Sequence, residues 1–422
     1  MIKILELFGG IGACSKALDN LGIEYEIADY VEIDKYAVKS YNAIHNTNFV
    51  PQDICNWDKD IEVDLIMHGS PCQDFSLAGK QAGGNENSGT RSSLMYETLR
   101  IVEKTMPKYV IWENVKNIIS KKHVHNFNSY VIRMTKLGYK SFYKVLNAKD
   151  FEIPQNRERV FTISIRKDIE KDFSFPHKTK LKLKLKDMLE NEVNEKYYLS
   201  DKMLNYIIAD NDKWTGNNSK SLINKTIAST INTHEGSRRC DASNYISKNI
   251  NDEDVDIKKY KINQIDNYLP IKNATKKGYL KAYDGDYVIL QYPNSKNRRG
   301  RVGEQVVNTL LCNDANGVVI YDDYNNHIKS NQSAIGTLTT NIGNSALRHG
   351  TKLILQSPAG LRIRKLTPKE CWRLMGFADE DFEKAAKVNS DTQLYKQAGN
   401  SIVVNVLMAI LTNLLIAERE EE

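Results

Sequence analysis

The chain has 422 residues, of which 41% are hydrophobic and 27% are charged, and its formal net charge is +6. These values are typical of a folded globular chain with room for two domains, and they exclude a disordered or low-complexity chain. The mild positive charge permits a polyanionic partner but does not require one.

The cysteine pattern and the chain ends indicate the compartment. None of the six cysteines forms a CxxC or zinc-type spacing, which predicts a reduced protein without a metal site. The N-terminus shows no signal peptide. The longest apolar stretch, residues 402–417, contains two asparagines and a threonine, and is too short and too polar to span a membrane. We therefore expect a cytoplasmic protein with no membrane partner.

The first predicted elements form a ligand cradle. A strand over residues 2–8 leads into the turn Phe8-Gly9-Gly10-Ile11-Gly12, and a helix is predicted over residues 13–21. A glycine turn between a strand and a helix lets a ligand approach the backbone closely. A second strand, over residues 25–33, ends near Glu32, whose carboxylate can accept hydrogen bonds from ribose hydroxyls. The alternative for Glu32 is a solvated carboxylate at a strand end.

The next predicted strand presents a cysteine. The apolar run over residues 64–68 is typical of a buried strand, and Gly69 and Pro71 end it with a turn. Cys72 then lies at the carboxyl end of a parallel strand, where open α/β sheets bind ligands. A thiolate there can attack an electron-poor carbon. The alternative is a small buried hydrophobic residue that ends the strand.

A long glycine-rich loop, residues 76–92, separates this strand from the next elements. A loop of this length is usually functional, although a flexible surface loop is the alternative. A helix is predicted over residues 94–106 and a strand over residues 108–112, followed by Glu113. Glu113 and Cys72 would share one edge of the sheet as an acid and a nucleophile, but a lone carboxylate at a strand end is common.

Two arginines follow in an extended segment. A helix is predicted over residues 127–137 and strands over residues 139–147 and 160–166, with Arg157 and Arg159 just before the last strand. Side chains at i and i+2 of an extended segment point the same way. The pair could hold a phosphate, hold a base oxygen, or only pair with Glu113.

Residues 168–360 carry no catalytic motif. The alternating lysines and leucines of residues 178–186 suit an exposed strand or the lead-in to a helix. Arginines at positions 298, 299 and 301 suit contacts with phosphates.

The last segment is predicted to be helical. Thr367 can cap a helix with Pro368 at its first position and Glu370 at its third. Asn400 and Ser401 are expected to start a further helix that runs to about residue 417.

Taken in order, these stretches resemble the motifs of the cytosine-5 DNA methyltransferases of bacterial and phage restriction-modification systems. The resemblance covers residues 1–166 and 361–417. The stretches are Phe8-x-Gly10-x-Gly12, Pro71-Cys72-Gln73, Glu113-Asn114-Val115, Gln155-x-Arg157-x-Arg159 and Gln397-Ala398-Gly399-Asn400-Ser401.

The resemblance implies an α/β fold. A Rossmann-like S-adenosylmethionine-dependent methyltransferase domain, with a mixed and mostly parallel sheet, would comprise residues 1–175. A smaller, irregular target-recognition domain would comprise residues 176–360. Residues 361–422 would return to complete the catalytic domain with the C-terminal helix.

The resemblance also implies roles for single residues. The catalytic residues would be Cys72, Glu113, Arg157 and Arg159. The cofactor-binding residues would be Phe8, Gly10, Gly12, Glu32, Asp53, Pro71, Asn400 and Ser401. The DNA-binding residues would be Gln73, Ser76, Arg91, Arg157, Thr337 and Leu338. The family often has an aromatic residue where this chain has Ile33, which would change the packing against adenine.

The implied reaction transfers a methyl group from S-adenosylmethionine to C5 of a cytosine in a specific duplex DNA sequence, leaving S-adenosylhomocysteine and using no metal. The base would be flipped out of the stack and Cys72 would attack C6. The implied setting is a monomer in the cytoplasm of a bacterial or phage-infected cell, with a cognate restriction endonuclease as a further partner. The alternatives are an RNA (tRNA) cytosine-5 methyltransferase and a catalytically silent DNA-binding relative.

Overall fold

The computed structural model describes most of the N-terminal part of the chain, parts of the middle, and the return segment. The described ranges are 1–71, 91–199, 220–221, 225–230, 268–273, 278–283, 286–289, 302–310, 316–321 and 361–416.

The first sheet has six strands in the order β2-β1-β3-β4-β7-β5. They are β1 (Ile2–Leu7), β2 (Tyr25–Val31), β3 (Leu65–His68), β4 (Tyr109–Val115), β5 (Tyr139–Asn147) and β7 (Glu158–Arg166). The first four are parallel, and β7 is antiparallel to both β4 and β5. The sheet is therefore mixed and mostly parallel, as predicted.

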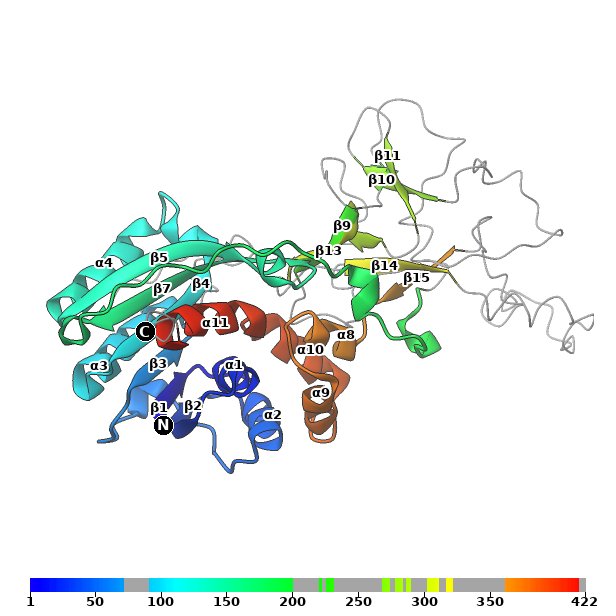
Figure 1. Ribbon diagram of the computed structural model, residues 1–422. Helices are drawn as coiled ribbons and strands as arrows, with labels where there is room; N and C mark the ends of the chain where they lie inside the picture. The colour runs from blue at the N-terminus through cyan, green and yellow to red at the C-terminus, as the bar shows by residue number, and fades with distance from the viewer. Residues whose placement is uncertain are drawn as a thin grey trace, which may run out of the picture.

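Helices cover both faces of this sheet (Figure 1). The helices on its two faces are α1 (Ala13–Leu21), α3 (Met95–Thr105), α4 (Val124–Lys136) and α11 (Val404–Leu411), and α2 (Lys35–His45) follows β2. Alternate residues of a strand point to opposite faces. Thus Ile4 and Met67 pack in one core cluster with α1 and α11, whereas Leu5 and Ile66 pack in another with α3 and α4.

A second sheet includes strands from three distant parts of the chain, in the order β15-β14-β12-β13-β6-β9. They are β6 (Gln155–Asn156), β9 (Lys225–Thr230), β12 (Tyr287–Ile289), β13 (Val302–Leu310), β14 (Asn316–Tyr321) and β15 (Leu361–Lys365). A third, small sheet contains β8 (Lys220–Ser221), β10 (Leu269–Asn273) and β11 (Tyr279–Ala282).

The second sheet includes residues from both sides of the expected domain boundaries. Gln155 of β6, from the first segment, pairs with Val307 of β13, and β15 pairs antiparallel with β14. The returning chain therefore still belongs to the second sheet at residues 361–365. It rejoins the core cluster of the first sheet at Leu366, which is fully buried there.

The predicted start of the last helix is wrong. Asn400 is the last residue of α10 (Asp391–Asn400), and Ser401 is its C-cap, whose N–H bonds the carbonyl of Gln397. The asparagine and serine thus end one helix rather than begin the next. The chain turns at Ser401, and α11 begins only at Val404.

The stretch Asp391–Ile416 is long and apolar enough to cross a membrane by length and composition alone. Half of its most apolar window is buried inside the protein. Leu407, Ile410 and Leu411 of α11 are fully buried against the first sheet. Its apolar character is accounted for by this core packing.

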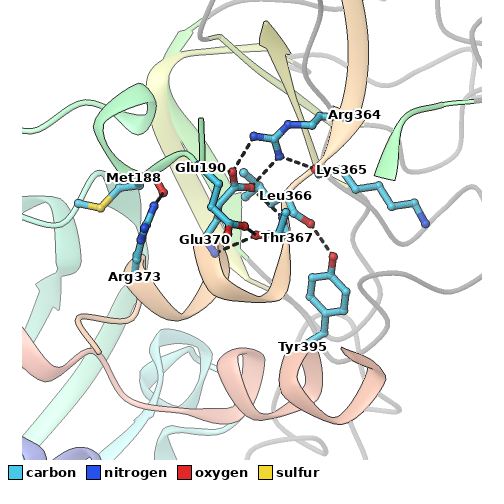
Figure 2. Close-up of polar contacts among 9 residues, drawn as sticks. All are labelled: Met188, Glu190, Arg364, Lys365, Leu366, Thr367, Glu370, Arg373 and Tyr395. Carbon is cyan, nitrogen blue, oxygen red and sulfur yellow. Dashed lines mark hydrogen bonds and ion pairs between the residues drawn. The ribbon is translucent and has the colours of Figure 1, made fainter. Parts of the chain in front are cut away.

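A buried ion pair fixes the point where the chain returns (Figure 2). Both terminal NH groups of the Arg364 guanidinium donate to the carboxylate of Glu370, at 2.6 and 2.8 Å, and both side chains are fully buried. Glu370 is the third residue of α8 (Pro368–Arg373) and also accepts the N–H of Thr367 at 2.7 Å, which confirms the predicted capping box. A carboxylate with this many donors is fixed in position.

Neighbouring segments join the same cluster. The N–H of Glu190 donates to Glu370 at 2.8 Å, and the hydroxyl of Tyr395 in α10 donates to the carbonyl of Leu366 at 2.6 Å (Figure 2). Arg373 donates to the carbonyl of Met188 at 3.0 Å and, through its guanidinium, pairs with Asp379 at the start of α9 (Asp379–Ala386). The buried pair therefore stabilises the joint between the two sheets and the C-terminal helices.

We predict that Glu370→Ala lowers the free energy of unfolding by about 3–5 kcal/mol, because it leaves the charge of Arg364 buried without its partner. Urea unfolding followed by circular dichroism measures this. Glu383→Ala, which removes an exposed partner of Lys369, is the control and should cost no more than about 0.5 kcal/mol. Equal losses in the two variants would contradict a special role for the buried pair.

Candidate active site

The glycine turn after β1 has a backbone that favours glycine. Gly12 has a φ of 80°, and a Cβ there would lie 2.3 Å from Nε2 of His45. Gly10 also has a positive φ, of 56°, but the space around it is open. The hydroxyl of Tyr30 donates to the carbonyl of Gly10 at 2.7 Å and holds the turn. Phe8, before the turn, has a φ of 53°, a strained value of the kind found at functional sites.

Glu32 is bonded to this turn. One carboxylate oxygen accepts the N–H of Gly10 at 3.1 Å, and the other accepts the N–H of Asp34 at 2.8 Å. Burial raises the pKa of the Glu32 carboxyl, against the lowering effect of these backbone hydrogen bonds. Each oxygen keeps a second lone pair for a ligand hydroxyl. Glu32 is therefore not only a solvated carboxylate at a strand end, because its hydrogen bonds hold the backbone of the glycine turn.

Asp53 is held near Glu32 by a backbone hydrogen bond of the preceding residue, Gln52. The N–H of Gln52 donates to the carbonyl of Glu32 at 2.8 Å. Asp53 itself is exposed and accepts the N–H of Cys55 at 3.0 Å. Ile33, next to Glu32, is 68% exposed. This rim of the cradle therefore offers an acceptor and an uncovered apolar surface.

Glu113 forms an ion pair with Arg159. Arg159 Nε of β7 lies 3.0 Å from Glu113 Oε1 at the end of β4, and both side chains are nearly buried. A Cβ on Gly69 would lie 3.8 Å from the other oxygen of Glu113. Because Gly69 follows β3 directly, the chain leaves the sheet toward Cys72 beside this carboxylate.

Arg157 lies between β6 and β7, two residues before Arg159, and contacts the turn after α10. Its side chain is buried, and its guanidinium donates to the carbonyls of Gly399 and Ser401. The sequence analysis expected a phosphate contact for Arg157, which no described contact tests, and the structure directs its terminal nitrogens to these backbone carbonyls.

One pocket joins the glycine turn, Glu113 and the turn after α10. Its lining consists of Glu6, Leu7, Phe8, Gly9, Gly10, Ala13, Cys14, Met67, Gly69, Glu113, Asn400, Ser401 and Ile402. The structure thus brings together five of the predicted site residues: Phe8, Gly10, Glu113, Asn400 and Ser401. Glu32 and Arg159 contact members of the lining, whereas Asp53 and Gly12 are not part of it. The open space at Gly10 and the acceptors of Glu32 fit a nucleoside cofactor.

The sequence analysis missed Glu6, although one charged residue inside the apolar run of β1 was a visible signal. Its carboxylate is buried and accepts hydrogen bonds from the hydroxyls of Ser15 and Tyr41. Burial raises the pKa of Glu6 to about 7, against the lowering effect of those hydrogen bonds. It anchors the start of α1 beneath the glycine turn.

A polar cluster behind Gly69 was also missed. The indole N–H of Trp112 donates to the hydroxyl of Ser70 at 3.0 Å, and His68 bonds the hydroxyl of Tyr130 at 2.9 Å. Burial lowers the pKa of His68 to about 3, so its ring is neutral. The cluster holds the residues that precede Cys72, and no sequence signal pairs Ser70 with Trp112.

Several predicted residues lie outside the described residues: Cys72, Gln73, Ser76, Thr337 and Leu338. Arg91 begins a short 3-10 helix, Arg91–Leu94, and Pro71 is the last described residue before Cys72. Among the described ranges, no group of three or more His, Cys, Asp or Glu side chains is placed to hold a metal ion.

Comparisons with known proteins agree on one family. A family model described as C-5 cytosine-specific DNA methylase matches residues 2–415. The chain is 32% identical to an orphan methyltransferase, M.Rho11sI, of Bacillus phage rho11s, covering 100% of this chain and 99% of the relative. It is 29% identical to a type II methyltransferase, M2.ScrFI, of Lactococcus lactis subsp. cremoris, covering 98% and 99%.

Solved structures share the fold. A mutant form of the DNMT2 of Spodoptera frugiperda is similar with a TM-score of 0.55 at 18% identity, covering 98% of this chain and 99% of the other. The Entamoeba histolytica methyltransferase EhMeth gives a TM-score of 0.54 at 14% identity, covering 100% and 99%. These likenesses support the α/β methyltransferase fold.

We predict that Glu6→Gln removes a pH dependence of stability. Because burial raises the folded pKa from 4.5 to about 7, Glu6 stabilises the fold most below about pH 4.5, and this contribution is lost as the pH rises through 7. The stability difference between variant and wild type should shift by roughly 3 kcal/mol over that window, in favour of the variant at high pH. Urea unfolding at several pH values measures it, and a difference that stays constant with pH would contradict the prediction.

Proposed function

The chain belongs to the C-5 cytosine-specific DNA methylase family and is a DNA cytosine methyltransferase, and we propose that it methylates C5 of one cytosine in a specific duplex DNA sequence. The observation that supports this most is the Glu113–Arg159 pair beside Gly69 in the pocket that also contains the glycine turn. In this proposal an acid, the thiol of Cys72 and a nucleoside cradle would share one edge of the sheet.

We assign the cofactor side of the pocket to S-adenosylmethionine, which supplies a methyl group carried on a positively charged sulfonium. Gly10 and the backbone of the glycine turn would hold its methionine part, with Phe8 near the adenine. Glu32 would accept the ribose hydroxyls, and Asp53 would accept the adenine amino group. The remaining wall would come from Gly12, Pro71, Asn400 and Ser401.

On the base side, the proposed mechanism starts with a cytosine flipped out of the duplex. The thiolate of Cys72 forms a bond to C6 while Glu113 shares a proton with N3, which lets the ring accept the added electron pair. C5 would then accept the methyl group that the bound cofactor supplies, with S-adenosylhomocysteine as the leaving group. Water removes the C5 proton, the Cys72–C6 bond breaks, and the net change is one methyl group gained and one proton lost. The assignment of Cys72 rests on its sequence context.

Arg159 has a defined task in this scheme. Its Nε lies 3.0 Å from Glu113 Oε1 in an ion pair without a hydrogen bond, so its charge would hold the Glu113 carboxyl in place when the base enters. The second oxygen of Glu113, on the side of Gly69, would face the base in this scheme.

The proposed DNA contacts are Gln73, Ser76, Arg91, Thr337 and Leu338. The proposed setting is a monomer in the cytoplasm. A cognate restriction endonuclease is the proposed protein partner by analogy with the type II relative, while the phage relative is named an orphan enzyme.

We predict that Cys72→Ala keeps affinity for duplex DNA and loses methyl transfer by at least about a thousandfold, because no other group forms the bond to C6. Filter binding and transfer of labelled methyl groups measure the two properties. Cys371→Ala, in the buried part of α8, is the matched control and should keep its turnover. Methyl transfer retained by Cys72→Ala would contradict the mechanism.

We also predict that Glu32→Ala weakens binding of S-adenosylmethionine by about tenfold or more, since it removes a charged acceptor and frees the N–H of Gly10. Calorimetry without DNA measures this. Glu26→Ala, an exposed change on β2, the strand that precedes Glu32, is the control. Unchanged affinity in Glu32→Ala would remove that residue from the site.

A further inference from the structure

Arg157 is a buried cation between β6 and β7, and the residue is only 4% exposed. One NH group donates to the carbonyl of Ser401 at 2.7 Å, and both terminal nitrogens lie 3.4 Å from the carbonyl of Gly399. A buried charge is costly unless its hydrogen bonds are made, so these carbonyls must stay in place.

The carbonyls belong to the C-terminal end of α10. The negative end of a helix dipole favours a cation, which adds to the hydrogen bonds. Ser401 ends α10, and Asn400 and Ser401 both line the pocket at the proposed cofactor side. The guanidinium therefore holds the backbone of a turn that forms the pocket wall.

The backbone of Arg157 is itself fixed. Its carbonyl accepts the N–H of Ala148 at 3.1 Å, and its N–H donates to the carbonyl of Gln155 at 3.1 Å. The side chain of Gln155 donates to the carbonyl of Leu374 at 2.8 Å. Two residues further along, Arg159 pairs with Glu113. A single short segment thus contacts both the turn after α10 and the acid.

We propose that Arg157 is a positioning residue that fixes the Gly399–Ser401 turn relative to Glu113. The two arginines of one extended segment then set the spacing between the cofactor side and the base side of the pocket. Arg157 does this through backbone carbonyls and without a phosphate contact. The inference rests on the proposed function, since it assigns Asn400 and Ser401 to the cofactor side.

The test compares two variants of the full-length protein. Arg157→Met keeps the length of the side chain but removes all donors, and Arg157→Lys keeps a charge that can bond one carbonyl. We expect S-adenosylmethionine affinity, measured by calorimetry without DNA, to fall by at least about tenfold in Arg157→Met and by less in Arg157→Lys. Lys116→Met, which removes an exposed lysine paired with Glu158, is the control and should bind the cofactor normally.

A second readout separates positioning from phosphate binding. The dissociation constant for duplex DNA is measured for wild type and for Arg157→Lys and Arg157→Met over a range of salt concentrations. A lost phosphate contact lowers the slope of log K against log salt by about 1. We expect the slope to stay unchanged. Normal cofactor affinity in both variants would overturn the proposal. A salt slope of DNA binding that falls by about 1 while cofactor affinity stays normal would overturn it as well, and would indicate a phosphate contact.

The outcome for wild type keeps the two claims apart. If wild type binds S-adenosylmethionine but methylates no DNA, the proposed function fails, and the cofactor affinities still decide the role of Arg157. If wild type methylates DNA and Arg157→Met binds the cofactor normally, only the positioning role fails. If wild type does not bind S-adenosylmethionine, both are overturned.

Discussion

Two fully buried charges, Arg364 and Glu370, determine where the interrupted catalytic domain closes. After β7, Phe173, Leu185 and Met188 still pack in the core cluster of the first sheet, and the chain rejoins that cluster at Leu366, so the distant parts need a link between them. Glu370 provides that link by accepting from Arg364, Thr367 and Glu190 at once. A buried pair of this kind adds little stability over an apolar pair, but it allows one arrangement of its partners.

Segments on both sides of this joint contribute residues to the site. Downstream of it, α10 delivers Asn400 and Ser401 to the pocket, and upstream Gln155 pairs with the second sheet while its side chain contacts Leu374. A shift of the second sheet would therefore act on the segment that carries Arg157 and Arg159. This arrangement connects the part of the chain proposed to recognise DNA with the residues proposed to hold the cofactor and the acid.

The elements that follow local rules were predictable from sequence. The inner strands β3 and β4 begin with short apolar runs, as expected for strands buried on both faces. The capping box at Thr367 and Glu370 and the helix over residues 13–21 have local signals, and the structure confirms both. The first helix starts from a glycine turn, and Gly12 is required there because His45 occupies the space of a Cβ.

The rest depends on contacts that have no local signal. Asn400 and Ser401 are good caps by residue type, but α10 extends to them and Arg157, more than 240 residues earlier, bonds the end of that helix. Glu6 is a charged residue inside a buried strand, and its role becomes visible only when Ser15 and Tyr41 lie beside it. The bonding of Ser70 to Trp112 likewise arises from the parallel pairing of β3 and β4.

Transfer of labelled methyl groups from S-adenosylmethionine into mixed-sequence duplex DNA, followed by bisulfite sequencing, tests the central claim most directly. We predict that label enters duplex DNA and that the protected cytosines share one recurring sequence context. Label that enters tRNA but not duplex DNA would contradict the assigned substrate. A protein that binds the cofactor and labels neither nucleic acid would contradict the proposed reaction.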